Sequence, residues 1–316
     1  MREWFILGAA GFIGDALTRS LLARADTRVV LGTRASSDPL DALARSAPER
    51  VELATYGELE HLDLDRLARA DVVVDLASPG RGRFASGFDL HSRIHGHVRL
   101  VDGLARREWP GRFVFLSSGG TIYGEGFLYP MQEDWPPHPA GEYGLEKAVV
   151  ELHLDTLRRG RALDSTVLRI SNAFGPRQPL RPGFGVIPAI AQALRDGEPF
   201  RRYGTGRSVR DYVYIDDVVE AVMRGAEVGA AGVFNIGSGV PTSVNDLLEM
   251  TEALTGRPVP VAPVSMPPGE PRAIVLDCAR AANVLGWRAS VGVREGLRRT
   301  LAHHGLVEAD SAAGVA

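Results

Sequence analysis

Short apolar segments alternate with longer helix-like segments through the first half of the chain. The short segments are rich in Val, Ile, Leu and Phe and are bounded by Gly, Pro or polar residues, which is typical of buried parallel strands. The segments between them are long enough for helices. The predicted strands are Trp4–Leu7, Val29–Leu31, Val72–Leu76 and Phe113–Leu116, and the predicted helices are Phe12–Ala25, Gly87–Arg107 and Glu142–Arg159.

This alternation predicts an α/β fold, with a Rossmann-type doubly wound parallel sheet and a smaller C-terminal substrate-binding lobe. Two later apolar runs, Thr166–Ile170 and Val233–Ile236, could extend the same sheet. The smaller lobe is expected where many of the 20 prolines fall, because irregular loops often cover a ligand. We assign residues 1–172 and about 208–240 to the sheet domain, about 173–207 and 241–302 to the smaller lobe, and 307–316 to a flexible tail.

Composition narrows the class of protein. The formal net charge is -3, so no general affinity for nucleic acid or acidic membranes is expected. The single cysteine, Cys278, excludes an internal disulfide and a cysteine-based zinc site, and it favours a reducing cytoplasm. No basic or apolar leader precedes the strand-like start Met1–Leu7, and no apolar run reaches membrane-spanning length. The expected protein is cytoplasmic, with neither a nucleic-acid nor a membrane partner.

A glycine-rich turn follows the first predicted strand. Its sequence, Gly8–Gly14 (GAAGFIG), opens directly into a predicted helix. Glycines allow such a turn to take positive φ and to approach a pyrophosphate, and the helix N-terminus points free N–H groups at the phosphates. A turn without a ligand could carry the same glycines. The position between a strand and a helix at the start of the chain nevertheless favours dinucleotide binding.

The end of the second strand leaves the choice between NAD and NADP open. NAD sites of this architecture usually carry an acid here that accepts from the ribose hydroxyls, but Gly32 occupies the position. Arg34 could pair with a 2′-phosphate, or it could be a solvated surface residue. Asp63 could contact the adenine amino group or could cap a helix.

Tyr143 and Lys147 are four residues apart and share one face of the last predicted helix. A tyrosine phenol has an ordinary pKa of about 10 and is a poor base at neutral pH. A nearby ammonium group and a bound nicotinamide favour the phenolate, which makes it a usable base. The strand Phe113–Leu116 leads into Ser117–Gly124 (SSGGTIYG), so a hydroxyl at Ser118 would lie at the carboxyl end of a central strand, where such folds bind ligands.

The chain resembles the extended short-chain dehydrogenase/reductases, and in particular the NAD-dependent epimerase/dehydratase family that includes UDP-glucose 4-epimerases. The resemblance runs from about Arg2 to about Ala302, and its motifs stand in order along the chain. They are Gly8–Gly14, Asp71–Ser78 (DVVVDLAS), Ser117–Gly124, Tyr143–Lys147 (YGLEK), Leu168–Gln178 (LRISNAFGPRQ), Val209–Asp217 (VRDYVYIDD), Phe234–Gly239 (FNIGSG) and Leu285–Trp287 (LGW).

The resemblance implies a role for each matching residue. Tyr143 resembles the catalytic base, and Lys147 the residue that binds the nicotinamide ribose and activates the tyrosine. Asn172 and Arg210 match positions that contact the phosphates of a sugar nucleotide, although Arg210 could also form a structural salt bridge. The implied cofactor-binding residues are Gly8, Gly11, Phe12, Ile13, Gly14, Arg34, Asp63, Leu76, Ala77, Tyr143 and Lys147.

Four positions depart from the family pattern. Gly119 replaces a family hydroxyl, so the catalytic hydroxyl must come from Ser118 or Thr121. No acid precedes Glu125 in that segment, which argues against dehydratase chemistry. An expected arginine aligns with Pro267, and Arg272 could substitute for it in substrate binding. An Asn-rich stretch reads His91–His97 (HSRIHGH), which we interpret as a polar helix face and not as a metal site, so no metal is predicted.

The resulting prediction is an enzyme: a nucleoside-diphosphate-sugar 4-epimerase of the UDP-glucose/UDP-galactose type, with NAD as cofactor and NADP as a possibility. An NADPH-dependent reductase of a 4-ketosugar nucleotide is the first alternative. A non-catalytic NAD(P)-sensing protein on the same fold is the second. The partner is a small sugar nucleotide, and family resemblance implies a homodimer through Gly87–Arg107 and Glu142–Arg159.

Overall fold

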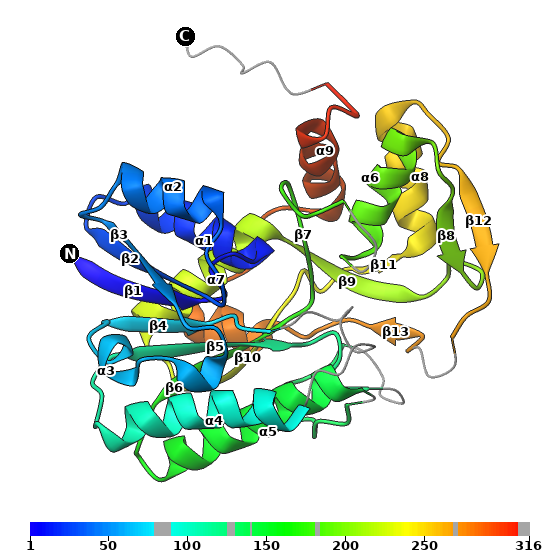
Figure 1. The fold of residues 1–316 in the computed structure, drawn as a ribbon. Helices are drawn as coiled ribbons and strands as arrows, with labels where there is room; N and C mark the ends of the chain where they lie inside the picture. Colours follow the sequence, from blue (N-terminus) through cyan, green and yellow to red (C-terminus); the bar gives the residue numbers. More distant parts are fainter. Residues whose placement is uncertain (79–89, 125–129, 140, 181–183, 268–270, 309–316) are drawn as a thin grey trace.

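A parallel β-sheet forms the larger lobe, and its strands run toward the smaller lobe at their carboxyl ends (Figure 1). The computed structural model describes residues 1–316 except 79–89, 125–129, 140, 181–183, 268–270 and 309–316. The seven strands are ordered β10-β6-β5-β4-β1-β2-β3, and each neighbouring pair is parallel. Their bounds are β1 Arg2–Leu7, β2 Thr27–Thr33, β3 Val51–Thr55, β4 Val72–Asp75, β5 Arg112–Ser118, β6 Ser165–Ile170 and β10 Gly232–Ile236.

Helices cover both faces of the sheet (Figure 1). Alternate residues of β1 point to opposite faces: Trp4 and Ile6 pack on one side, whereas Phe5 and Leu7 pack on the other. This two-sided burial explains why the strands read as continuous apolar runs. One face carries α1 Phe12–Leu22, α2 Asp38–Ser46 and α7 Ile215–Val228, and the other carries α3 Leu64–Leu67, α4 Leu90–Arg106 and α5 Glu142–Arg159.

The predicted Rossmann-type fold is confirmed, and each predicted strand and helix of the sheet domain is present with bounds shifted by a few residues. Glu142–Arg159 is found with the bounds that the sequence predicted. Sequence reasoning missed α2 and the edge strand β3. β3 (VELAT) is only half-buried along most of its length, so it lacks the continuous apolar run that marks the central strands.

The smaller lobe contains a four-stranded sheet and a two-stranded sheet, packed against three helices. In the first sheet β11, β9 and β13 are neighbours and β7 also pairs with β9, while β8 pairs with β12 in the second. The elements are β7 Asn172–Phe174, β8 Phe200–Tyr203, β9 Val209–Tyr214, β11 Pro241–Ser243, β12 Val261–Val264, β13 Ala273–Ile274, α6 Val186–Asp196, α8 Val244–Thr255 and α9 Val293–His303.

The division into domains and the flexible tail are two further predictions. The proposed division into domains stays a prediction, although β9, which we assigned to the sheet domain, hydrogen-bonds within the smaller sheet. Most of the predicted flexible tail, residues 309–316, lies outside the described residues, as does the start of the helix predicted from Gly87. None of the helices in the described part of the chain has the length and apolar character that spanning a bilayer requires.

Candidate active site

The glycine-rich turn lies between the carboxyl end of β1 and the first turn of α1. Gly8 has φ of +82°, and its N–H donates to the carbonyl of Gly32 at 2.9 Å. A Cβ at Gly14 would lie 2.4 Å from the Gly8 carbonyl oxygen, so only glycine allows the helix to approach the turn this closely. α1 begins at Phe12 after an extended Gly11, and no side chain caps its N-terminus. The turn therefore has the shape and the open N–H groups that bind a pyrophosphate.

The wall beside this turn comes from the end of β4. A Cβ at Gly8 would lie 3.0 Å from the carbonyl oxygen of Leu76 and 3.2 Å from the amide nitrogen of Ala77. The Ala77 N–H in turn donates to the Asp75 carboxylate at 3.0 Å. The structure therefore brings Leu76 and Ala77, both predicted cofactor contacts, against the glycine-rich turn.

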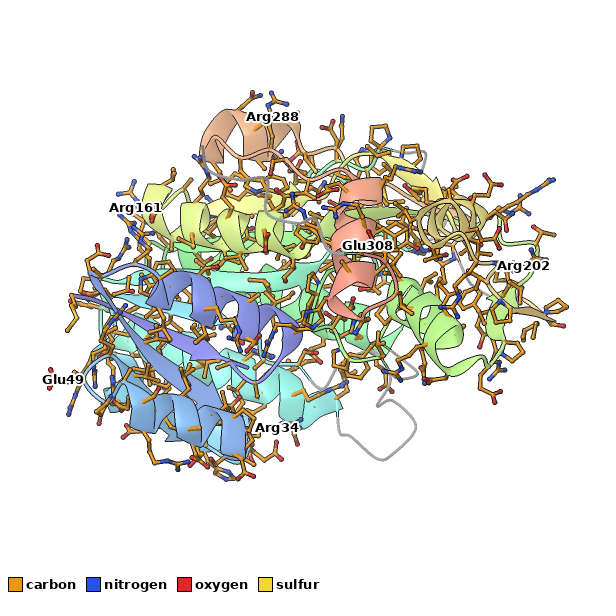
Figure 2. The ribbon with its side chains drawn as sticks, turned by 90° about the horizontal axis from the view of Figure 1, so that it is seen from above. Arg34, Glu49, Arg161, Arg202, Arg288 and Glu308 are labelled. Atoms are coloured by element: carbon orange, nitrogen blue, oxygen red, sulfur yellow. The ribbon has the colours of Figure 1, made fainter. Side chains whose placement is uncertain are left out.

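The end of β2 carries no acidic side chain at the position that NAD sites usually use. A Cβ at Gly32 would lie 2.7 Å from Cε1 of Phe5, so the packing beneath the ribose position leaves little room for a side chain. Arg34 is exposed directly after the strand. It lies on the side of the larger lobe that is nearer to the smaller lobe, whereas Glu49 lies at the far end (Figure 2). A contact between Arg34 and the adenosine ribose or its 2′-phosphate stays a prediction.

Asp63 has the structural role that the sequence left as an alternative. It is the N-cap of α3, and its carboxylate accepts from the N–H groups of Asp65 and Arg66 at 2.9 and 3.0 Å. This capping role explains why an aspartate stands at position 63, and it requires no bound ligand. The contact with adenine stays a prediction.

Tyr143 and Lys147 lie one turn apart at the start of α5. Lys147 is only 1% exposed, and its Nζ lies 5.8 Å from the centroid of the Tyr143 ring and 4.6 Å from that of Phe115. Tyr143 itself is half-buried. The structure therefore places a buried ammonium beneath a phenol that is partly open to solvent.

Ser118 and Thr121 lie in the turn against which α5 packs. Ser118 ends β5 and is buried, and its carbonyl accepts from the N–H groups of Thr121 and Ile122 at 3.3 and 3.1 Å. A Cβ at Gly144 would lie 2.8 Å from the Thr121 carbonyl oxygen, which shows how closely α5 approaches this turn. The turn that carries both candidate hydroxyls is thus next to the first turn of α5. The buried Oγ1 of Thr121 has no hydrogen-bond partner among the described residues.

The missing hydroxyl at Gly119 has a steric explanation. A Cβ there would lie 2.5 Å from Cδ1 of Leu276 and 3.1 Å from the carbonyl oxygen of Arg169. Leu276 is buried in a small cluster with Ile122. The space that a serine side chain would need at position 119 is therefore filled by Leu276.

The predicted substrate-binding residues gather around β9 of the smaller lobe. Asn172 on β7 donates from Nδ2 to the carbonyl of Asp211 at 2.9 Å. Arg210 on β9 donates from Nη1 to the carbonyls of Val209 and Pro271, each at 2.9 Å. Arg272, which is exposed, accepts at its own carbonyl from the Val209 N–H at 2.9 Å. Arg210 therefore lies on β9, and Arg272 directly precedes β13, the strand that pairs with β9.

The segment His91–His97 is not the uniformly polar helix face that we predicted. His91 and His95 are exposed, but His97 is only 3% exposed, and its Nδ1 lies 2.7 Å from the fully buried carboxylate of Asp75. Among the described residues, no group of three or more His, Cys, Asp or Glu could hold a metal ion. Sequence reasoning missed this buried pair because its members come from different elements, β4 and α4.

The comparison with protein families decides the assignment, because the model of the NAD-dependent epimerase/dehydratase family matches residues 4–237. The chain belongs to this family. Membership confirms the resemblance drawn from the motifs, and with it the predicted class of enzyme and its NAD cofactor.

Relatives with different reactions match nearly the whole chain. A UDP-glucose 4-epimerase from Mycolicibacterium smegmatis is 34% identical over 94% of this chain and 96% of its own length. A dTDP-4-dehydro-6-deoxyglucose reductase from Escherichia coli is 29% identical over 94% of this chain and 95% of its own length. These relatives therefore share the use of a sugar nucleotide as substrate, but they do not share one reaction.

Solved structures support the same class. A UDP-glucose 4-epimerase from Thermotoga maritima with UDP-glucose has a TM-score of 0.83 and 30% identity, and it covers 96% of this chain and 98% of its own. A UDP-glucose 4-epimerase from Thermus thermophilus in complex with NAD has a TM-score of 0.82 and 27% identity, with 95% of this chain and 98% of its own covered.

Proposed function

We propose that the protein is a nucleoside-diphosphate-sugar 4-epimerase of the UDP-glucose/UDP-galactose type. The observation that carries this proposal is that the first turn of α5 holds Tyr143 over the buried Lys147 and packs against the turn that contains Ser118 and Thr121. In Ser117–Gly124 no side chain is acidic, and this favours epimerisation over elimination. The related UDP-glucose 4-epimerases support the same substrate class.

The glycine-rich turn fits the dinucleotide that the proposal requires. Its pyrophosphate would lie against Gly8, Gly11 and the N–H groups of Phe12 and Ile13, because Gly14 allows α1 to begin close to the turn. Leu76 and Ala77 would bound the site on the β4 side. When bound there, the dinucleotide would supply the hydride acceptor and donor that inversion at the sugar's C4 requires.

The chain's own groups would manage the proton and the substrate. Tyr143 would take the proton of the sugar 4-hydroxyl, and the buried ammonium of Lys147 would stabilise the phenolate that makes this possible. Ser118 or Thr121 would donate a hydrogen bond to the same oxygen as its charge develops. Of these two, Thr121 has the buried hydroxyl that no described residue satisfies, which favours it as the donor.

The diphosphate would lie against the smaller lobe. Arg210 lies on β9, and the exposed Arg272 directly precedes β13, which pairs with β9. Asn172 lies on β7, which also pairs with β9. Arginine suits this role because its planar donors match two phosphate oxygens at once.

One observation favours a second candidate, an NADPH-dependent reductase of a 4-ketosugar nucleotide. Gly32 offers no carboxylate to a ribose, and the exposed Arg34 could pair with a 2′-phosphate. The reductase among the relatives shows that the family includes this type of reaction.

The first experiment is to identify the dinucleotide released on denaturing the purified protein and to incubate the native protein with UDP-glucose. We expect tightly held NAD and conversion to UDP-galactose with no lasting change in NADH absorbance, because each hydride that leaves the sugar returns to it. Steady consumption of NADPH with a 4-ketosugar nucleotide, without interconversion of the two UDP-hexoses, would instead establish the reductase.

We also propose that the protein forms a homodimer through α4 and α5, in the reducing cytoplasm that its single cysteine favours. Leu145 and Leu152 lie two turns apart on α5 and are 42% and 68% exposed. Two copies of this helix pair would bury both leucines in an intersubunit bundle.

Leu152→Glu should therefore yield a monomer at micromolar concentration, because a carboxylate would be buried without a partner. Sedimentation equilibrium measures the mass directly. Val228→Glu is the matched control, since Val228 is 49% exposed at the end of α7 and should tolerate the charge without loss of the dimer. A monomeric wild-type protein, or a Leu152→Glu protein that remains dimeric, would contradict the proposed interface.

A further inference from the structure

A buried group of charges lies directly beneath the catalytic lysine. Asp75 at the end of β4 and Glu146 on α5 are both 0% exposed, and His97 on α4 lies between them. His97 Nδ1 is 2.7 Å from Asp75, and its Nε2 is 3.7 Å from Glu146. Glu146 lies 3.8 Å from Nζ of Lys147. Burying this many charges is expensive unless they compensate one another.

The orientation of the imidazole indicates its charge. Both ring nitrogens face carboxylates, and an imidazole is a donor at both positions only when it is protonated. Burial alone would lower the pKa of His97, but the Asp75 and Glu146 carboxylates together outweigh it and raise the pKa above its ordinary value. Burial alone would raise the pKa of the Asp75 carboxyl group, but the ion pair with His97 outweighs burial and lowers it.

Charge compensation matters because the charge of Lys147 also acts on both carboxylates. Besides His97 and Lys147, Arg93 of α4 faces Glu146, with Nε at 3.3 Å. The edge of the His97 ring also packs against Phe115, over which the Lys147 ammonium lies. Without the imidazolium, Lys147 would be the cation among the described residues that still compensates Asp75, and in this buried setting the attraction would be strong.

We propose that His97 is a positioning residue: its imidazolium neutralises the buried carboxylates of Asp75 and Glu146, so that the Lys147 ammonium stays available to Tyr143 and to the cofactor ribose. The role deepens the proposed function and rests on it. The same residue supports the cofactor wall, since the Asp75 carboxylate that it holds accepts the Ala77 N–H beside the glycine-rich turn.

The test compares His97→Gln with the double variant Asp75→Asn/His97→Gln. In His97→Gln the uncompensated Asp75 should draw Lys147 away, so the acidic limb of the pH profile of kcat should move up by about one pH unit. At neutral pH kcat should fall about 10-fold, with KM for UDP-glucose little changed. The double variant also removes the Asp75 carboxylate. The acidic limb of its pH profile should therefore return to the wild-type position.

The matched control is His95→Gln on the same helix, because the His95 side chain is 55% exposed and should leave the profile unchanged. A His97→Gln enzyme with an unmoved limb would overturn the proposal. So would a double variant whose limb stays displaced, because a merely structural defect is not repaired by removing the partner carboxylate.

A second measurement needs neither substrate nor a stable His97 variant. NMR of isotope-labelled histidine in the holoprotein reports the protonation of each ring. It is recorded in a His153→Gln background, because His153 Nε2 also lies 2.7 Å from a carboxylate, that of Asp102, and its signals must be kept apart from those of His97. As the pH is raised, we expect one imidazolium to persist after the other histidines have become neutral, because an ordinary histidine has a pKa of about 6.5. If no imidazolium outlasts the others, the proposal fails. A persistent imidazolium in a protein without epimerase activity would contradict the proposed function instead.

Discussion

Tyr143→Phe should lower kcat about 10³-fold or more while the dinucleotide stays bound. The substitution removes the phenolic oxygen that we propose takes a proton from the sugar, and general-base catalysis of this kind is worth about 10²–10⁴ in rate. The ring remains, so its packing above the buried Lys147 should persist, together with the fold around it. The glycine-rich turn is on β1 and α1 and should be unaffected. The measurements are the initial rate of UDP-glucose conversion and the dinucleotide recovered per protein chain.

Tyr203→Phe is the matched control for this loss. Tyr203 is at the end of β8, and its side chain is 43% exposed, so removal of its hydroxyl should leave kcat within about twofold. If Tyr143→Phe kept near wild-type turnover, Tyr143 would not be the base, and the 4-epimerase assignment would lose its central residue. Loss of both turnover and bound dinucleotide would point to a role for Tyr143 in holding the cofactor.

The parts of this site that sequence alone predicted are those that follow from local pattern. The glycine-rich turn, the spacing of Tyr143 and Lys147 and the apolar strands each depend on neighbours within a few residues, or on the period of one element. The ordered motifs then identified the family, which the family model confirms. The fold class followed from the same alternation of strands and helices.

The parts that sequence did not predict depend on contacts between elements. His97 belongs to a polar stretch of α4, and only the topology of the sheet brings it to Asp75 on β4. The loss of a hydroxyl at Gly119 is explained by Leu276, which is far away in the chain. Pairings of this kind carry no periodic signal, so a single sequence contains no local trace of them.

Asp211 is a further residue of this kind, and its carboxylate joins three segments of the smaller lobe. It is fully buried on β9 and accepts hydrogen bonds from the N–H groups of Ser238, Gly239 and Leu276 at 2.7, 3.1 and 3.2 Å. The Ser238 hydroxyl adds a bond at 2.8 Å. A Cβ at Gly237 would lie 2.3 Å from the same carboxylate, so the main chain closes tightly around it.

Asp211→Asn should therefore destabilise the protein by about 3–5 kcal/mol. An amide has only one acceptor oxygen, and its NH₂ group would face donors that already need a partner, so charge-assisted bonds are lost and buried N–H groups are left unsatisfied. For a chain of this size we expect the Tm to fall by about 5–8 °C. β9 also carries Arg210, so KM for UDP-glucose should rise more than kcat falls.

Thermal unfolding and steady-state kinetics of Asp211→Asn and of Asp216→Asn test this prediction together. Asp216 is exposed at the start of α7, so its substitution should change the Tm by no more than about 2 °C. Equal Tm values for the two variants would show that the hydrogen bonds of Asp211 contribute little to stability. A lowered Tm with an unchanged KM would show that Asp211 stabilises the fold but does not position Arg210. The result would then give no support to Arg210 as a diphosphate ligand.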